Sequence, residues 1–477
     1  MAHALAGKPV QEQDIIDVQT IVDAYFDNVP DMTNPTQLVS FGTSGHRGTS
    51  VDGTFTDLHV AAITQAICDG RKQFGATGPI FVGQDTHALS QPALVTVLEV
   101  LAGNGVTAMV DCDMDFVPTP SVSRAIIRYN EEHDDKADGI IITPSHNPPD
   151  NGGIKYNTII GGPADTVVTK WIEMRANEYL TAYCESEAFK RISIDNIEPT
   201  AQVPYDYKGL YVEELGDVIN MEAIKAAGPK VLVDTLGGSG ASYWNAIKER
   251  YGLDLTIIHD DYDPTFSFMT YDHDGKVRMD CSSTYVMASV INRIGDFDLA
   301  VGNDPDYDRY GIVVSSGLIS ANTFLTLAAR YLFTTRGWKN KGVGKTVVCT
   351  TMIDKWAADA ETPVFEVPVG FKYFSQLLFD GAIGIGGEES AGASFLKRDG
   401  TVWTTDKDGM IMALLSMEIM AVMGKSALKM ADESLEEFGN PSFGRIDAPC
   451  KKEQKQILKQ MSAELITATT VDGDPIT

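Results

Sequence analysis

A serine in a stiff loop is the first residue of this sequence whose setting suggests chemistry. Ser145 follows the apolar run of residues 137–143, in the string PSHNPP that spans residues 144–149. Prolines hold such a loop rigid and keep it from becoming helix. A hydroxyl displayed beside His146, with Lys155 ten residues further on, suits a nucleophile with acid/base helpers. The alternative is a simple serine turn. The G-x-S-x-G elbow is absent, which weakens an acyl-transfer interpretation.

Three aspartates at alternate positions form the second candidate site. Asp304, Asp306 and Asp308 follow the apolar run FDLAVGN. Alternate residues of an extended loop point to one side, so these carboxylates can converge on a hard cation. Since the group contains no histidine or cysteine, it favours Mg²⁺ over zinc. An EF-hand does not fit, because Arg309 and Ser315 stand where that loop needs glycine and glutamate. The alternative is an acidic turn on an acidic protein.

Further candidates for binding an anion or a sugar lie in or beside glycine-containing loops. The loop FGTSGHRG, residues 41–48, exposes backbone N–H groups that admit an anion. Its side chains of interest are Thr43, Ser44, His46 and Arg47, and the cations elsewhere are Arg309, Lys372 and Lys407. Each of these cations could instead be a solvated surface charge. After the run AIGIGG, Glu388 and Ser390 offer a carboxylate and a hydroxyl that suit sugar hydroxyls, with a helix N-cap as the alternative.

The composition restricts the partners. The 477 residues include 38 Lys and Arg against 66 Asp and Glu, which gives a net charge of −28. Such a surface repels nucleic acid and anionic membranes, so we expect neither as a partner. It would also repel a phosphate ester, which therefore needs cations concentrated at its site. Six scattered cysteines without a C-x-x-C pair indicate neither a zinc site nor a disulfide framework.

Targeting and membrane signals are weak. The N-terminal residues have no apolar signal core, and the apolar stretch Met410–Met423 is too short to span a bilayer and is broken by Glu418. We expect a core helix at this stretch and a cytoplasmic location for the protein.

These loops need a scaffold of strands and helices. Short β-branched runs alternate with amphipathic stretches, which indicates α/β units with parallel or mixed sheets. We expect strands at Ile80–Gly83, Gly139–Thr143, Val231–Asp234, Asp298–Gly302, Thr346–Cys349 and Ala382–Gly386, and helices at Leu58–Phe74, Pro92–Asn104 and Ser282–Ile294. Candidate linkers divide the chain into three α/β domains, residues 1–205, 206–316 and 317–430, followed by residues 431–477. The candidate loops follow strands, where open α/β sheets bind ligands.

Several strings together resemble one protein family. FGTSGHRG, TPSHNPP with GGIKYN, NDPDYDR, VPVGFK, GGEESAG and DKDG occur in the order found in the α-D-phosphohexomutase superfamily, and resemble its bacterial phosphoglucomutases. The resemblance implies three consecutive related α/β domains with mixed sheets around a central cleft, and a truncated start of a fourth domain at 431–477. It also implies an isomerase that interconverts glucose 1-phosphate and glucose 6-phosphate through glucose 1,6-bisphosphate.

The resemblance also implies roles for the candidate residues. Ser145 would carry a phosphate and, with Asp304, Asp306 and Asp308, would hold Mg²⁺. The acid/base candidates would be Lys155 and His146, and the groups that stabilise charge on the transferring phosphoryl would be Arg47 and Arg309. The remaining substrate-binding residues would be Thr43, Ser44 and His46, with Glu388 and Ser390 on sugar hydroxyls and Lys372 and Lys407 on the distal phosphate or the ring.

Two features depart from the family pattern. Gln84 stands where many relatives carry Lys or Arg, and the C-terminal phosphate-binding loop of the type R-P-S-G-T-E is missing from this chain. Loss of remote binding energy lowers turnover, so we expect weakened mutase activity. A Mg²⁺-dependent sugar-phosphate phosphatase and a non-catalytic sugar-phosphate-binding protein remain alternatives. The string GEESAG favours glucose over mannose or glucosamine phosphates, and both a monomer and a homodimer remain open.

Overall fold

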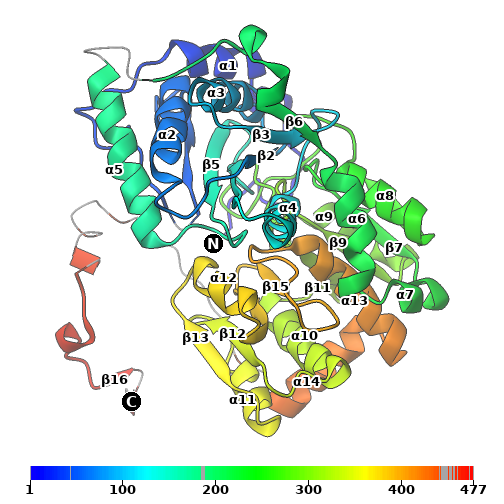
Figure 1. Ribbon diagram of the computed structural model, residues 1–477. Helices are drawn as coiled ribbons and strands as arrows, with labels where there is room; N and C mark the ends of the chain where they lie inside the picture. Colours follow the sequence, from blue (N-terminus) through cyan, green and yellow to red (C-terminus); the bar gives the residue numbers. More distant parts are fainter. Residues whose placement is uncertain are drawn as a thin grey trace. The chain divides into compact units, whose positions relative to one another are not determined.

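The computed structural model describes residues 2–42, 44–183, 189–439, 441, 450, 454, 457–458, 460–471 and 473–475. The chain divides into two compact units, Met1–Asn440 and Pro441–Thr477. The described part of the second unit contains the short helix η5 (Ala463–Leu465) and the antiparallel strands β16 (Thr470–Val471) and β17 (Asp474–Pro475). The first unit contains three larger sheets, each mixed in strand direction (Figure 1).

The first sheet has the strand order β1-β5-β4-β2-β3-β6. Neighbours among β4, β2, β3 and β6 pair in parallel, β5 is antiparallel to β4, and β1 is antiparallel to β5. The strands are β1 (His46–Thr49), β2 (Ile80–Gln84), β3 (Ala108–Asp111), β4 (Asp138–Ile142), β5 (Asn151–Asn157) and β6 (Gln202–Tyr205). The helices around it are α1 (Val18–Asp27), α2 (Asp57–Gly70), α3 (Ser90–Gly103), α4 (Thr119–Glu132) and α5 (Thr166–Tyr183). Ile140 and Ile142 pack with α2, α3 and α5, while Ile141 packs with α4. This alternation is that of a strand buried on both faces.

The second sheet has the order β11-β10-β9-β7-β8. Neighbours among β8, β7 and β9 pair in parallel, β10 is antiparallel to β9, and β11 is antiparallel to β10. Its strands are β7 (Val231–Asp234), β8 (Leu255–Ile258), β9 (Leu299–Gly302), β10 (Gly311–Val314) and β11 (Gly317–Leu318). Its helices are α6 (Tyr207–Val218), α7 (Met221–Ala227), α8 (Ala241–Tyr251) and α9 (Ala288–Ile291). The loop after β9 carries the three aspartates, so the sheet presents them at the carboxyl end of a central strand.

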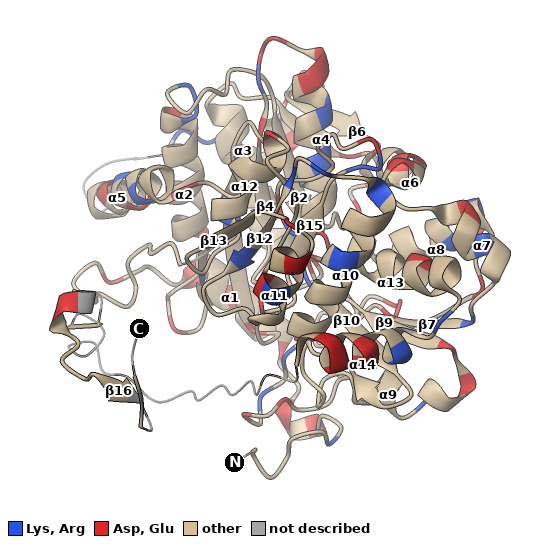
Figure 2. Cartoon of the chain, turned by 90° about the horizontal axis from the view of Figure 1, so that it is seen from below, with Lys and Arg blue, Asp and Glu red and all other residues tan. Residues whose placement is uncertain are grey.

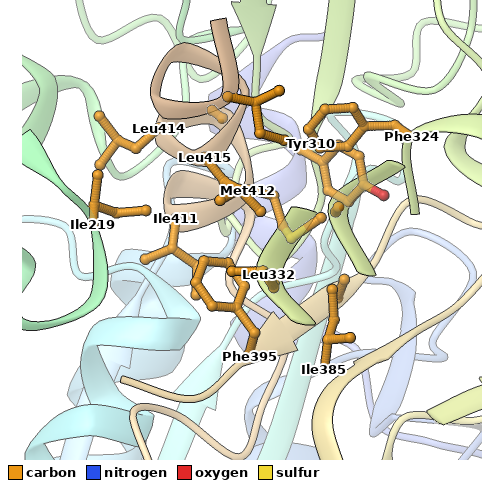
Figure 3. Packing of buried hydrophobic residues seen from close by; sticks show 14 of the residues in the cluster. Ile219, Tyr310, Phe324, Leu332, Ile385, Phe395, Ile411, Met412, Leu414 and Leu415 are labelled. Atoms are coloured by element: carbon orange, nitrogen blue, oxygen red, sulfur yellow. The ribbon is translucent and has the colours of Figure 1, made fainter. Parts of the chain in front are cut away.

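The third sheet has the order β13-β12-β14-β15, parallel except for β15. The strands are β12 (Gly342–Thr346), β13 (Val364–Val367), β14 (Ile383–Gly387) and β15 (Ala393–Phe395), and the helices are α10 (Ala321–Arg336), α11 (Met352–Asp359), α12 (Lys372–Phe379), α13 (Gly409–Met423) and α14 (Ala427–Phe438). Helix α13 packs against β9, β10 and α7 as well as β15. One apolar cluster therefore runs from Tyr310 through Ile411 and Leu415 to Phe395 (Figure 3), and the second and third sheets share a core.

Glu418, which interrupts the apolar stretch of α13, is buried and paired. Its carboxylate accepts hydrogen bonds from Tyr331 Oη (2.8 Å), Arg336 Nη2 (2.8 Å) and the Asn220 backbone N–H (2.7 Å). A buried charge is tolerated when it is paired in this way. Among the described residues no single helix is long and apolar enough to cross a membrane, although the bent pair Gly409–Met423 and Leu428–Phe438 passes the same test by length and composition.

Most of the expected elements are present. The α/β class with mixed sheets is confirmed, as are the strands near residues 80, 139, 231, 298 and 382 and the helices near 58, 92 and 410. The strand expected at Thr346–Cys349 is wrong: β12 is Gly342–Thr346, and Val347 and Val348 are exposed after it. Glycines at 342 and 344 hide this strand from a pattern based on β-branched residues. The helix expected at Ser282–Ile294 is reduced to the single turn α9, because residues 282–287 form turns.

Charged side chains are spread over many elements of the surface, with an acidic run along α14 (Figure 2). Lys155 and Lys407 differ from that pattern because they are only 4% and 8% exposed. A buried lysine needs an anionic partner. These two lysines therefore point to the place where the chain concentrates positive charge.

Candidate active site

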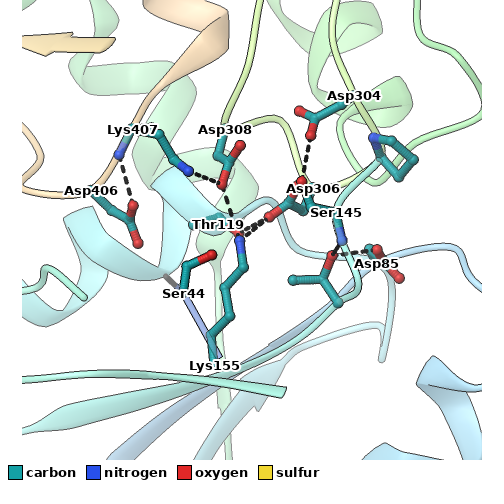
Figure 4. Close-up of polar contacts among 12 residues, drawn as sticks. Ser44, Asp85, Thr119, Ser145, Lys155, Asp304, Asp306, Asp308, Asp406 and Lys407 are labelled. Carbon is teal, nitrogen blue, oxygen red and sulfur yellow. Dashed lines mark hydrogen bonds and ion pairs between the residues drawn. The ribbon is translucent and has the colours of Figure 1, made fainter. Parts of the chain in front are cut away.

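Ser145 lies in a strained turn directly beyond the carboxyl end of β4. Its φ angle is 60°, in the left-handed region that a non-glycine residue adopts at a cost of roughly 1–3 kcal/mol. The side chain is 1% exposed. Its Oγ donates to Asp304 Oδ2 at 2.8 Å (Figure 4). The same Oγ lies 3.3 Å from His146 Nδ1. The left-handed backbone at Ser145 therefore orients this hydroxyl toward Asp304, in the loop after β9.

The three aspartates converge as their spacing predicts. Asp304, Asp306 and Asp308 are at most 1% exposed, and one oxygen of each lies within 4.8 Å of the others. The turn between them is also unusual, since Tyr307 has φ 63°. The Arg309 backbone N–H donates to Asp304 Oδ1 at 2.9 Å and so closes the loop on itself.

Electrostatics distinguish the members of this group. Burial, together with the charges of Asp306 and Asp308, holds the pKa of Asp304 well above its usual range. Burial also acts to raise the pKa of Asp308, but Lys155 and Lys407 outweigh it and hold that pKa below its usual range. The carboxylates are thus a set of crowded negative charges that require cations beside them.

Two lysines, one on the first sheet and one in the loop before α13, supply part of that charge. Lys155, on β5, places Nζ 2.5 Å from Asp306 Oδ2 and 3.0 Å from Asp308 Oδ2. Lys407, before α13, places Nζ 2.8 Å from the same Asp308 oxygen. Gly392 is needed here, because a Cβ on it would lie 2.3 Å from the Lys407 side chain. Burial lowers the pKa of Lys155 but the aspartates raise it by more, so it carries its proton.

The arginines approach the same centre from strand β1, which carries Arg47, and from the loop after β9, which carries Arg309. Arg47 Nη2 donates to Ser44 Oγ at 3.3 Å, and its Nη1 reaches Asn147 Oδ1, in the serine turn, at 3.5 Å. Arg309 Nη1 pairs with Asp280 Oδ2 at 3.2 Å. Burial, with the charge of Arg309 second, lowers the pKa of His146 to about 3. His146 is thus neutral beside a hydroxyl that several cations surround.

The donor set fits a hard divalent cation. Asp306 Oδ1 and Asp308 Oδ1 are buried oxygens without a hydrogen-bond partner, which is rare for carboxylates in a protein interior. All the candidate ligand atoms are oxygens, and oxygen ligands select Mg²⁺, Ca²⁺ or Mn²⁺ over zinc. The three aspartates and the adjacent Ser145 hydroxyl are therefore suited to hold such an ion.

The sugar-binding candidates differ in burial: Glu388 is 6% exposed, whereas Ser390 and Lys372 are half-buried. Glu388, at the end of β14, accepts from the Gly370 N–H at 3.1 Å, and burial raises its pKa. Ser390 is half-buried two residues further on. Lys372, at the start of α12, donates to Thr166 Oγ1 at 2.9 Å, an exposed contact between the third sheet's helices and α5. Gly392 lies between Glu388 and the phosphoryl centre, because a Cβ on it would lie close to both the Lys407 side chain and Glu388 Oε2.

One predicted residue, His46, is not brought to the centre. His46 is 3% exposed, and its ring nitrogens lie against backbone oxygens of Thr54 (2.9 Å) and Ser40 (3.3 Å). It therefore supports the loop 41–48 from within. Thr43 lies outside the described residues.

Other residues that hold the centre were missed from the sequence. Thr119, at the start of α4, donates to Asp306 Oδ2 at 2.8 Å. Asp406 accepts from Asn157 Nδ2 at 2.9 Å and so joins the Lys407 loop to β5. Asp280 pairs with Arg309. Their partners are more than 25 residues away along the chain, so no local spacing could have revealed these contacts.

Three models of one family match the sequence. They are described as phosphoglucomutase/phosphomannomutase alpha/beta/alpha domains I, II and III, and they match residues 38–182, 210–317 and 320–438. Phosphoglucomutase of Komagataeibacter xylinus is 47% identical over 476 residues, which cover 99% of this chain and 85% of that protein. Phosphoglucomutase 1 of Saccharomyces cerevisiae is 27% identical, with coverage of 91% and 79%. The open form of parafusin from Paramecium, at 21% identity, superimposes with a TM-score of 0.68 and covers 87% of this chain and 76% of that chain, which supports the fold.

Proposed function

The chain belongs to the phosphoglucomutase/phosphomannomutase family, and from that membership we propose that it interconverts glucose 1-phosphate and glucose 6-phosphate through a phosphate carried on Ser145. The observation that carries the proposal is the contact of Ser145 Oγ with Asp304, inside a buried group of three aspartates and two lysines. The glucose assignment follows the 47% identical phosphoglucomutase and the string GEESAG.

The reaction is two phosphoryl transfers. In the first, the 6-hydroxyl oxygen of glucose 1-phosphate bonds to the phosphorus on Ser145 and its proton passes to a base, while the bond from phosphorus to Oγ breaks and Oγ takes a proton from an acid. The product, glucose 1,6-bisphosphate, turns over in the site. In the second, Ser145 Oγ gives its proton to a base and bonds to the phosphorus at position 1, and the sugar oxygen leaves and takes a proton. His146 and Lys155 are the acid/base candidates, since both lie at this centre.

The chain's cations do most of the work of such a transfer, because its transition state is stabilised by positioning and charge neutralisation. Arg47, Arg309 and Lys407 join Lys155 around Ser145. We assign Mg²⁺ to Asp304, Asp306, Asp308 and an oxygen of the Ser145 phosphate; when bound it would neutralise part of the phosphoryl charge. Ser44, Glu388, Ser390 and Lys372 are assigned to the sugar and to its non-reacting phosphate.

The domain division remains part of the proposal. The matched ranges support domains at 1–205, 206–316 and 317–430. The expectations of a cytoplasmic location, a monomer or homodimer, and no nucleic acid or membrane partner remain predictions.

A coupled assay tests the function. The purified chain, with Mg²⁺ and a trace of glucose 1,6-bisphosphate, should form glucose 6-phosphate from glucose 1-phosphate, and mass spectrometry should find phosphate on Ser145. Release of free phosphate faster than isomerisation would show that the chain is a phosphatase and not a mutase. If Ser145 carries no phosphate and no product forms, the chain would be a sugar-phosphate-binding protein without catalytic activity.

A further inference from the structure

The turn that carries Ser145 is held at both of its ends. On one side, the Ser145 backbone N–H donates to Thr143 Oγ1 at 2.7 Å. On the other side, His87 Nε2 lies 3.0 Å from the Asn147 carbonyl oxygen. A left-handed conformation at a non-glycine residue persists only where its surroundings enforce it. These two contacts are therefore candidates for the interactions that hold Ser145 in the left-handed conformation.

Both contacts lead back to one carboxylate. Asp85 Oδ2 accepts from Thr143 Oγ1 at 2.5 Å and lies 2.9 Å from His87 Nδ1. The other oxygen, Oδ1, accepts from Ser90 Oγ at 2.6 Å and from the His87 backbone N–H at 3.0 Å. Asp85, His87 and Thr143 are fully buried. Since β2 and β4 are neighbours in the first sheet, Asp85 after β2 lies beside Thr143 after β4.

The geometry fixes the protonation of His87. Its ring nitrogens face a carboxylate and a carbonyl oxygen, and both of these groups only accept. Both nitrogens must therefore donate, and the ring is an imidazolium that balances Asp85. Burial acts to lower the pKa of His87, and the Asp85 carboxylate raises it by more. The ring also contacts Phe266 of the second domain, at 5.0 Å between centroids.

We propose that Asp85, His87 and Thr143 are positioning residues for phosphoryl transfer at Ser145. They hold the backbone on either side of the serine, so that Oγ stays aligned with the phosphorus atom it exchanges. The inference rests on the proposed function. Because the three residues act through the turn, their loss should lower kcat and leave the KM for glucose 1-phosphate almost unchanged. A displacement of about 1 Å at a reacting atom can cost about 100-fold in rate.

The test uses matched variants of the full chain. Thr143→Val removes the hydroxyl at nearly constant shape, whereas Thr143→Ser keeps it. Ser90→Ala removes a different hydrogen bond to Asp85, one that does not lead to the turn. His87→Gln replaces the two ring nitrogens that face these acceptors by a single amide nitrogen. We expect kcat, and the single-turnover rate of Ser145 phosphorylation by glucose 1,6-bisphosphate, to fall about 10- to 100-fold in T143V and H87Q. In T143S and S90A both rates should stay within about threefold, and KM should change by less than about threefold in all four.

The outcomes separate the inference from the function on which it rests. If T143V and H87Q match S90A in kcat, or if they raise KM while kcat holds, the positioning role is refuted although the mutase assignment stands. If the unsubstituted chain forms no glucose 6-phosphate, the function itself fails first. A second measurement does not depend on kinetics: ¹⁵N NMR of His87 in the unsubstituted chain, assigned by its loss in H87Q, should show two protonated ring nitrogens at neutral pH. A single protonated nitrogen would overturn the inference.

Discussion

The phosphoryl region and the sugar region of this site are built differently. Around Ser145 the three aspartates, Lys155 and Lys407 are almost fully buried and already in contact, as the ion pairs of both lysines with Asp308 show (Figure 4). In the sugar region, the buried Glu388 accepts from a backbone N–H, and Lys372 makes an exposed contact with Thr166. The first region is organised before the substrate binds, whereas the second keeps its polar groups available for the substrate.

Physical chemistry explains the contrast. Charges taken out of water must be paired at once, because an unpaired buried charge is far more costly than a paired one. Preorganised charges around a reacting phosphoryl group also lose no energy to rearrangement during transfer. Sugar hydroxyls are neutral, so the groups that bind them can exchange water for substrate. Substitutions in the two regions should therefore differ in size and in the kinetic constant they affect.

Removing the nucleophile should have the largest effect. Ser145→Ala should lower the isomerisation rate on the order of 10⁴-fold or more, because no group in contact with Asp304 could then carry the phosphate. Intact mass spectrometry after exposure to glucose 1,6-bisphosphate should show the added phosphate on the unsubstituted chain and not on S145A. If S145A retained even a hundredth of the activity, another residue would have to carry the phosphate, and the comparison of the two regions would fail.

The aspartates should follow. Asp306→Asn removes one charge from the proposed cation site and from the Lys155 pair, and should lower kcat by about 10²- to 10³-fold, as loss of one preorganised charge-stabilising group does. Raising the Mg²⁺ concentration should restore part of the activity, and EDTA should inactivate the unsubstituted chain reversibly. Asp113→Asn, in an exposed acidic group away from the site, is the control. Equal losses of kcat in D306N and D113N would show that the three aspartates do not form a specific cation site.

In the sugar region, Glu388→Gln should affect kcat/KM more modestly. A hydrogen bond from a neutral donor to a charged group contributes about 1.5–3 kcal/mol, which corresponds to a loss of about 10- to 100-fold. Phosphorylation of Ser145 should persist in E388Q, because Glu388 touches neither the serine nor the aspartates directly. If E388Q abolished phosphorylation of Ser145 as well, the two regions would be one unit and the comparison would be wrong.

The contrast also shows which parts of the site were readable from sequence. Ser145 and the three aspartates lie in short loops after apolar strands, so their local spacing predicted a nucleophile and a cation site. The contacts of Lys407 with Asp308 and of Thr119 with Asp306 join residues 99 and 187 positions apart, and only the packed sheets bring them together. The strand Gly342–Thr346 was missed because its glycines carry no β-branched signal. Its neighbours in the sheet, β13 and β14, still show the α/β class.

Lys372 should give the smallest effect and the sharpest test of the openness of the sugar region. Its ammonium is free of buried partners in the described structure and donates to the exposed Thr166 hydroxyl. A solvated charge contact contributes about 0.2–1 kcal/mol, so Lys372→Ala should raise KM by about two- to fivefold and leave kcat unchanged. Because screening weakens exposed charges, the difference from the unsubstituted chain should shrink as salt rises from 0.05 to about 0.5 M. Lys339→Ala, an exposed lysine of the same domain, is the matched control. A large loss of kcat in K372A would mean that the substrate closes the sugar region over Lys372 and buries it as deeply as Lys155.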